Sequence, residues 1–252
     1  DAGSIPGIKV DKGTKPLPFC PGELITEGLD GLGERLDEYA KLGARFAKWR
    51  AVIDIGTGIP THTAVNTNSH ALARYAAICQ EQGLVPIVEP EVLMDGDHTI
   101  EHCHEITEWT LSAVFDALYN QRVVPEQMVL KPSMVIAGKD CVFQAGVKEV
   151  AERTLTVLKR TVPAAVPGIA FLSGGQSDEL ATAHLDAMNR LGGAPWTLSF
   201  SYGRALQQAP LKAWRGAAAN VPAAQAALAH RARMNGLAAV GQYRAELEKK
   251  AA

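Results

Sequence analysis

The chain has 252 residues and a formal net charge of −2, because 25 Lys and Arg residues are set against 27 Asp and Glu residues. Hydrophobic residues make up 47% and charged residues 21%, which is typical of a globular protein and excludes disordered, collagen-like and coiled-coil chains. The near-neutral charge gives no electrostatic basis for binding nucleic acid or a membrane surface. No apolar run is long enough to predict a membrane span.

The four cysteines, Cys20, Cys79, Cys103 and Cys141, are irregularly spaced and contain no C-x-x-C pair. In a chain of this size the pattern indicates reduced thiols and a cytoplasmic protein, with a plastid location as the alternative if a transit peptide once preceded residue 1. No linker or low-complexity block divides the chain, so we expect one domain over residues 1–252 with a helical C-terminal segment.

Short apolar runs alternate with longer amphipathic ones, which predicts repeated βα units and a parallel sheet. The expected strands are, in chain order, 5–11, 44–55, 84–91, 128–136, 168–173 and 196–202. The expected helices are 32–42, 68–82, 98–119, 147–160, 178–189 and 222–237. Segments 14–21 and 54–63 are expected to be variable loops.

Charged residues occur near the ends of four of these strands, although parallel strands covered on both faces are normally apolar. They are Lys9 and Asp11, Lys48 and Arg50, Glu89 and Glu91, and the isolated Lys131. A spacing of two places both members of a pair on one face of a strand. Because buried charges are costly unless they pair or do chemistry, the pattern favours a site at the carboxyl ends of the strands. Trp49 is expected to pack in the core or against a helix, and its place between Lys48 and Arg50 makes support of the charged face the alternative.

Lys131 is the strongest candidate nucleophile, because it lies in the apolar run Met128–Val135. An apolar setting and neighbouring cations both disfavour the ammonium form, and a neutral lysine attacks carbonyl groups to give a Schiff base. Glu89 or Glu91 supplies a carboxylate for proton transfer. A Schiff base draws electrons, so a carbon–carbon bond beta to the original carbonyl can break or form.

Two glycine-containing loops follow the last two expected strands and predict a phosphate site. The first contains Ser173, Gly174 and Gly175, and the second contains Ser201, Gly203 and Arg204. Glycines allow backbone N–H groups to approach a phosphate closely, and an arginine binds it with two parallel hydrogen bonds. Together with the buried lysine, these loops indicate a phosphorylated carbonyl substrate.

Six motifs occur in the order seen in class I fructose-bisphosphate aldolases, which this sequence resembles from about residue 5 to residue 243. They are GIKVDKG (7–13), FAKWR (46–50), VPIVEPE (85–91), LKPSM (130–134), FLSGGQS (171–177) and FSYGRAL (200–206). The resemblance implies a TIM barrel that cleaves fructose 1,6-bisphosphate reversibly to dihydroxyacetone phosphate and glyceraldehyde 3-phosphate without a cofactor or metal. It also implies a homotetramer in sugar metabolism whose ligands are sugar phosphates.

The resemblance assigns roles to the residues that match the family's motifs. Lys131 forms the Schiff base, Glu89 is the acid and base of the carbinolamine steps, and Lys48 completes the catalytic group. The substrate-binding residues that it implies are Lys9, Arg50, Glu91, Ser173, Gly174, Gly175, Ser201, Gly203 and Arg204. Only six of the eight strands of a barrel are predicted, and we therefore expect the sequence to lack the N-terminal part of a longer protein.

Three alternatives follow from the same residues. One is another lysine-dependent barrel, similar to a transaldolase or a deoxyribose-phosphate aldolase, and another is a sugar-phosphate-binding scaffold without activity. The third is a metal site made by His98, His102, Cys103 and His104. Consecutive helix positions point about 100° apart, so this set cannot converge on one ion, and a solvent-facing start of a helix is the expected arrangement.

Overall fold

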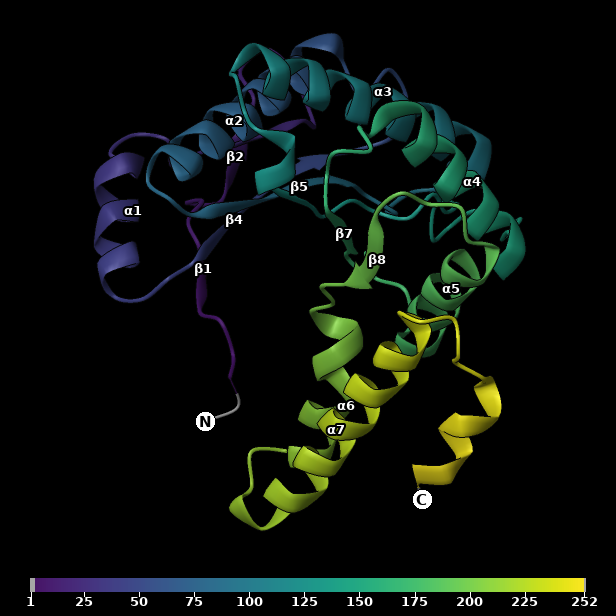
Figure 1. The fold of residues 1–252 in the computed structure, drawn as a ribbon. Coiled ribbons are helices and arrows are strands. Elements are labelled where there is room, and N and C mark those ends of the chain that lie inside the picture. The colour runs from purple at the N-terminus through teal and green to yellow at the C-terminus, as the bar shows by residue number, and fades with distance from the viewer. Residues whose placement is uncertain (1–2, 252) are drawn as a thin grey trace.

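The computed structural model describes residues 3–251 and contains a six-stranded parallel sheet. Its strands are β1 (Gly7–Lys9), β4 (Phe46–Ile53), β5 (Val85–Val92), β6 (Val129–Leu130), β7 (Gly168–Phe171) and β8 (Thr197–Phe200), and they pair in chain order. The sheet curves into an arc whose two ends are β1 and β8 (Figure 1). Every strand expected from the sequence is present, and each carboxyl end lies at the same edge of the sheet.

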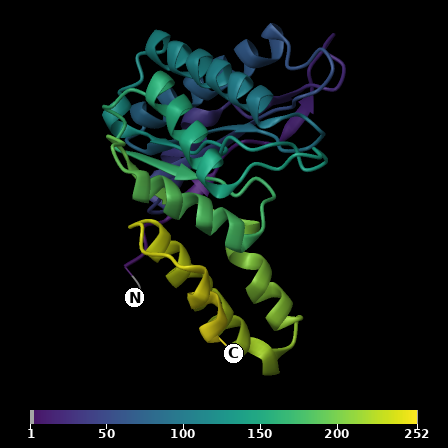
Figure 2. The ribbon, with the colours of Figure 1, turned by 90° about the vertical axis from the view of Figure 1, so that its right-hand side faces the viewer.

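Helices cover the convex side of this arc, as right-handed βα crossovers require (Figure 1). They are α1 (Leu32–Lys41), α2 (His62–Glu81), α3 (Ile100–Asn120), α4 (Val147–Thr161) and α5 (Asp178–Leu191). The helices α6 (Arg204–Trp214) and α7 (Val221–Ala238) pack against each other and extend away from the sheet, with the short helix η3 (Ala245–Ala251) beside them (Figure 2). Two further single turns are η1 (Pro125–Gln127) and η2 (Ala218–Asn220).

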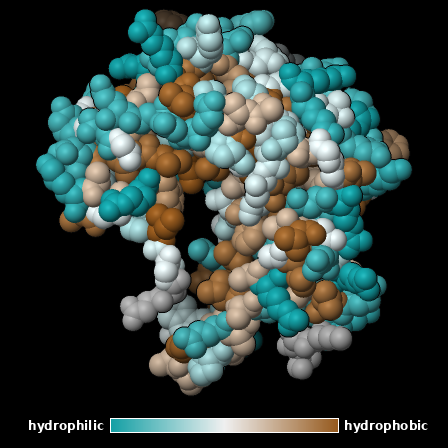
Figure 3. All heavy atoms as spheres, in the orientation of Figure 1, coloured by the Kyte–Doolittle hydropathy of each residue, from teal (hydrophilic) through white to brown (hydrophobic). Residues whose placement is uncertain are grey.

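The outer helices present a mostly hydrophilic surface, whereas hydrophobic atoms gather along the hollow between the N-terminal segment and the α6–α7 pair (Figure 3). Leu211 and Trp214 of α6 are 58% and 42% exposed. Among residues 3–251, no helix combines the length and the apolar character that a membrane crossing requires.

Alternation along β4 separates the packing side of the sheet from the charged side. Trp49 is fully buried and stacks on Tyr75 of α2, with 5.6 Å between ring centroids. The Tyr75 hydroxyl donates to the carbonyl oxygen of Ala47 at 2.7 Å and that of Ile87 at 3.2 Å, so it bridges β4 and β5. Lys48 and Arg50 lie at the alternate positions. The expectation that Trp49 packs in the core against a helix is confirmed. The alternative, that it supports the charged face, is wrong, because the period of two directs its ring to the helices.

Three segments differ from the sequence expectations. The strand expected at 128–136 is only Val129–Leu130, because Pro132 has no N–H for the ladder and the N–H of Val135 donates instead to Thr154 Oγ1 at 2.9 Å. The expected loop at 14–21 begins with β2 (Thr14–Pro16), which pairs antiparallel with β3 (Leu24–Thr26), and the expected loop at 54–63 ends in the first residues of α2. Helix α6 was not expected, since it contains Pro210.

The start of α2 is set by a buried carboxylate. Thr61 is the N-cap, and its hydroxyl accepts from the Ala64 N–H at 3.1 Å. Glu23, beside the hairpin, accepts from the Thr61 N–H at 2.7 Å and from its hydroxyl at 2.6 Å. A partner 38 positions away thus helps to fix the helix start, and no local pattern in 54–63 reveals it.

Tyr75→Phe tests the bridge between β4 and β5. We expect a loss of about 1–3 kcal/mol in the free energy of unfolding, because the substitution removes a buried hydroxyl that serves two strand carbonyl groups. Urea unfolding followed by circular dichroism measures this loss. Tyr119→Phe is the matched control, because Tyr119 is 83% exposed and should lose almost nothing. Equal stability of the two variants would contradict the bridging role.

Candidate active site

The charged residues predicted from the strand ends meet on the concave side of the sheet around one buried carboxylate. Lys131 Nζ lies 3.1 Å from Glu89 Oε1, and Lys48 Nζ forms an ion pair with the other oxygen, Glu89 Oε2. Glu89 is 3% exposed and Lys131 is 8% exposed. Three neighbouring strands supply these side chains, because Lys48 lies on β4, Glu89 lies on β5 and Lys131 directly follows β6. A single carboxylate therefore holds two amines at once.

A second set of ion pairs extends the site towards β1. Arg50 Nε pairs with Glu91 Oε2, and Lys9 Nζ pairs with Asp11 Oδ1 at 2.6 Å. Burial lowers the pKa of Arg50, but the hydrogen bond to Glu91 and the nearby carboxylates outweigh it, so the net pKa is raised and the guanidinium stays charged. Lys9 is half exposed, which leaves its ammonium accessible at the mouth of the site. Asp11, the second member of the first strand-end pair, holds Lys9 in place.

The loop after β7 is a tight turn that requires its two glycines. The Gln176 N–H donates to the Ser173 carbonyl oxygen at 3.0 Å, and the residues between them, Gly174 and Gly175, have φ of 57° and 90°. Positive φ at both central positions defines a type I′ turn, which non-glycine residues adopt only with strain. Within residues 3–251, no backbone carbonyl oxygen accepts from the N–H of Gly174 or Gly175. These two donors are free to bind an anion.

Arg204, the first residue of α6, follows β8 and lies beside this turn. A methyl group added to Gly175 would lie 3.0 Å from Met94 Sδ and 3.5 Å from Arg204 Nη2. Gly203 is the N-cap of α6, and its carbonyl oxygen accepts from Leu206 and Gln207, so the first N–H groups of the helix have no helical partner. Ser201, whose N–H donates to the Phe171 carbonyl oxygen at 2.8 Å, links the two loops. The structure thus brings together all the residues predicted to bind phosphate: Ser173, Gly174, Gly175, Ser201, Gly203 and Arg204.

Met94 was not predicted from sequence, and it belongs to a rigid unit made by two loops. The loop after β5 and the loop after β6 are joined by hydrogen bonds from Gly138 N to His98 O (2.8 Å), Lys139 N to Met94 O (2.7 Å) and Asp140 N to Gly96 O (2.9 Å). A Cβ atom on Gly138 would lie 2.3 Å from the Gly96 carbonyl oxygen. An ion pair between Lys139 and Asp95 closes the same unit.

The expectation of a solvent-facing helix start at His98 is wrong. His98 is buried under this loop unit, and neither ring nitrogen has a hydrogen-bond partner among the described residues. Burial lowers its pKa and His102 adds to the effect, whereas Asp97 and Asp54 oppose it. His102 and His104 instead face Glu105 and Glu108 on the surface of α3. In the part of the chain that is described, no three His, Cys, Asp or Glu side chains are grouped to hold a metal ion.

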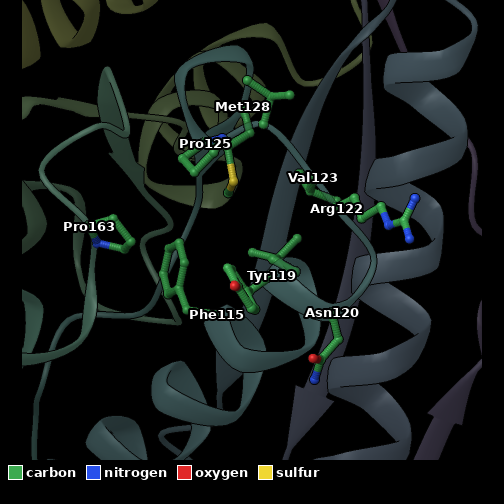
Figure 4. Close-up of a pocket in the computed structure, with 10 residues that line it drawn as sticks. Phe115, Tyr119, Asn120, Arg122, Val123, Pro125, Met128 and Pro163 are labelled. Atoms are coloured by element: carbon green, nitrogen blue, oxygen red, sulfur yellow. The ribbon is translucent and has the colours of Figure 1, made fainter.

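A cavity of about 720 Å³ (Figure 4) is lined by Met128, which precedes β6, and by residues at the end of α3, so it lies at the amino ends of the strands and away from these charges. The lining residues come from the end of α3, from the segment that follows it, and from Pro163, whose carbonyl oxygen accepts from Trp196 Nε1. They are Phe115, Leu118, Tyr119, Asn120, Arg122, Val123, Val124, Pro125, Met128 and Pro163. It contains none of the residues predicted to act on substrate. Size therefore does not identify the reactive site here, whereas the convergence of amines, carboxylates and free N–H groups does.

Comparison with known proteins assigns a family to this arrangement. The whole chain, residues 1–252, matches the family described as glycolytic fructose-bisphosphate aldolase class I. The chain belongs to this family. It is 64% identical over 245 residues to the probable fructose-bisphosphate aldolase class 1 of Xanthomonas campestris pv. campestris, covering 97% of this chain and 73% of that protein. It is 53% identical over 249 residues to the cytosolic fructose-bisphosphate aldolase 4 of Arabidopsis thaliana, covering 98% of this chain and 63% of that protein.

A solved structure supports the same assignment. The fructose-bisphosphate aldolase of Plasmodium falciparum, crystallised with TRAP and a small-molecule inhibitor, superposes with a TM-score of 0.94 at 51% identity and covers 95% of this chain and 70% of that one. The barrel fold class predicted from the sequence is thereby confirmed, with six of its parallel strands within residues 3–251. The activity is that of a class I fructose-bisphosphate aldolase, and the ligands are sugar phosphates.

Burial of His98 predicts a loss of stability in mild acid. Its lowered pKa means that, as the pH falls below 6.5, the unfolded chain takes up a proton at this position before the folded chain does. The free energy of unfolding should therefore decline as the pH falls from 7 to 5, and His98→Phe should decline less steeply. Denaturation curves at each pH measure the slopes. His70→Phe, at an exposed position of α2, should keep the parental slope, and parallel slopes for His98→Phe and the parent would refute the prediction.

Proposed function

We propose that Lys131 is the nucleophile of the aldolase reaction and that Glu89 moves its protons. The observation that carries this proposal is the contact of two amines, those of Lys131 and Lys48, with the two oxygens of one buried carboxylate. This arrangement places a proton acceptor directly on the reacting nitrogen, which apolar surroundings alone would not provide. Lys48 holds the other oxygen of Glu89 while the proton of Lys131 is transferred.

The proposed steps from ammonium to Schiff base are balanced within this group. Glu89 takes one proton from Lys131, and the neutral amine adds its lone pair to the C2 carbonyl carbon of fructose 1,6-bisphosphate. Glu89 returns this proton to the carbonyl oxygen, takes a second proton from the nitrogen and delivers it to the same oxygen, which leaves as water. The result is an iminium ion on Lys131, with Glu89 again a carboxylate.

The iminium ion then accepts the electron pair of the C3–C4 bond. Bond cleavage leaves an enamine on Lys131, and the C4 hydroxyl passes its proton to the Glu89 carboxylate as it becomes the aldehyde of glyceraldehyde 3-phosphate. Glu89 returns this proton to the enamine at C3, and addition of one water to the resulting iminium ion releases dihydroxyacetone phosphate and restores Lys131. No electrons are gained or lost overall, so the reaction needs no redox partner.

We assign the phosphate of the dihydroxyacetone half to the two loops at β7 and β8. The N–H groups of Gly174 and Gly175 have no backbone acceptor, and the guanidinium of Arg204 lies beside Gly175 as a further donor. Ser173 and Ser201 add hydroxyl groups, and Gly203 begins α6, whose first N–H groups favour an anion. Lys9 and Arg50 are the cations at the other end of the site, where Glu91 orients the guanidinium for the second anionic end of the sugar.

We also propose a cytoplasmic enzyme that works as a homotetramer formed from a single aldolase domain. The cytosolic designation of the Arabidopsis relative and the four free thiols support the location. Light scattering of the purified protein at several concentrations measures the subunit number, and a monomer throughout that range would exclude the tetramer.

Lys131→Met should abolish covalent trapping of dihydroxyacetone phosphate by borohydride, because the thioether of methionine cannot form an imine. Lys131→Arg should fail equally, because a guanidinium does not lose its proton in proteins. Intact-protein and peptide mass spectrometry detect the trapped adduct. Lys148→Met, which removes an exposed lysine of α4, is the control and should be trapped like the parent. An adduct on another lysine in the Lys131→Met variant would overturn the assignment.

Gly175→Ala should weaken phosphate binding with little loss of fold. The added methyl group would lie 3.0 Å from Met94 Sδ, and the φ of 90° at this position is strained for alanine. The turn must therefore shift, which moves its N–H groups away from the phosphate. We expect the KM to rise about tenfold or more, since a lost hydrogen bond to a charged group costs about 1.5–3 kcal/mol. Gly216→Ala at the end of α6 has a φ of 72° and open space around it, so it carries similar backbone strain away from the site. Unchanged KM in Gly175→Ala would remove the turn from the phosphate site.

A further inference from the structure

The side chain of Gln176, at the end of the glycine turn, uses both ends of its amide in buried contacts. Its Nε2 group donates to the Ser173 carbonyl oxygen at 3.0 Å and to Met134 Sδ at 3.6 Å. Its Oε1 atom lies 2.6 Å from His184 Nδ1. The Ser173 carbonyl oxygen therefore accepts two hydrogen bonds from one residue, from the Gln176 backbone N–H and from its amide, and both close the turn.

His184 anchors this amide to α5. The ring is 2% exposed, and burial lowers its pKa to about 4, so the imidazole is neutral at pH 7. Because the Gln176 Nε2 group faces a carbonyl oxygen, its Oε1 atom faces His184 and must accept. The proton of the neutral ring is thus on Nδ1, and Nε2 is buried without a partner among the described residues. This buried unpaired nitrogen costs stability, which a purely structural contact would not require.

We propose that Gln176 and His184 are positioning residues that hold the glycine turn in its phosphate-binding conformation. The inference rests on the proposed function of the turn and adds a chain of contacts behind it, from α5 through His184 and Gln176 to Ser173. Neither side chain touches the phosphate. They act on where the N–H groups of Gly174 and Gly175 point.

Glycine flexibility is the reason that such a brace is needed. Two successive glycines lose more conformational freedom on ordering than any other pair of residues. A turn that is already fixed before the substrate arrives loses less entropy on binding. The Met134 contact extends the brace to the segment that follows Lys131, so the same amide links the phosphate turn to the strand that carries the nucleophile.

Helix α5 provides a matched control within two residues of His184. Thr182 is fully buried, and its hydroxyl donates to Asn235 Oδ1 of α7 at 2.6 Å. Thr182→Val therefore removes a buried hydrogen bond of α5 that leads to α7 and not to the turn. His184→Phe removes the donor to Gln176 while keeping an aromatic ring, and His184→Gln restores an N–H donor.

The experiment measures the KM and kcat for fructose 1,6-bisphosphate, the Kd for inorganic phosphate and the melting temperature of each variant. We expect His184→Phe and Gln176→Met to raise both the KM and the phosphate Kd by about three- to tenfold with kcat nearly unchanged. The double variant, His184→Phe with Gln176→Met, should have a phosphate Kd no higher than that of the weaker-binding single variant, because the two residues act through one chain of contacts. His184→Gln should recover most of the affinity, and Thr182→Val should lower the melting temperature while leaving the KM and the phosphate Kd unchanged.

Two results would overturn the proposal. One is an unchanged phosphate Kd in both His184→Phe and Gln176→Met, and the other is an equal change in Thr182→Val, which would reduce the pair to general packing of α5. If either single variant does not fold, the phosphate Kd of His184→Gln is compared with that of the parent. The proposal then requires that these two Kd values differ by less than twofold. Borohydride trapping at Lys131 with saturating dihydroxyacetone phosphate separates this test from the proposed function. The parent must be trapped there for the proposed function to hold, whatever the brace variants do.

Discussion

The structure depends on one buried carboxylate, that of Glu89, which pairs with two amines at the centre of the concave face. Two ammonium groups removed from water repel each other, and neither is stable there without a negative partner. Placing the acid between them satisfies both and leaves each of its oxygens in contact with one nitrogen. In the proposed mechanism, the same contact also gives the Lys131 nitrogen a route for its protons. Stability and chemistry are therefore served by a single interaction.

The parallel register of the sheet produces this arrangement. Arg50 lies opposite Glu89 in the ladder, and Val52 lies opposite Glu91. Each acid of β5 therefore forms its ion pair with the cation two residues before its ladder partner, Glu89 with Lys48 and Glu91 with Arg50. Trp49 and Tyr75 pack on the opposite side of the same two strands and keep them in place. A slip of one residue would turn every one of these side chains to the wrong face. The apolar packing of the outer layer therefore determines the geometry of the inner one.

Much of this could be predicted from the residues alone, because the relevant signals are local. The spacing of two in Lys48 and Arg50, and in Glu89 and Glu91, indicated a shared face, and the glycines at 174 and 175 indicated a turn. Features that depend on distant partners could not be found in that way. The start of α2 depends on Glu23, and the burial of His98 depends on a loop more than thirty residues later. Gln176 belongs to a recognisable sequence motif, but its contact with His184 forms only when α5 packs against the turn, so the motif alone does not reveal it.

Gly138 shows how such distant dependence constrains the protein. Because any larger residue there would force apart the joined loops after β5 and β6, it would displace Met94, which forms one wall beside Gly175. In the proposed phosphate site, the position of the Met94 wall is thus governed by Gly138, which lies behind it. A substitution at Gly138 would therefore alter ligand affinity, although the residues next to it in the sequence do not indicate a role in ligand binding.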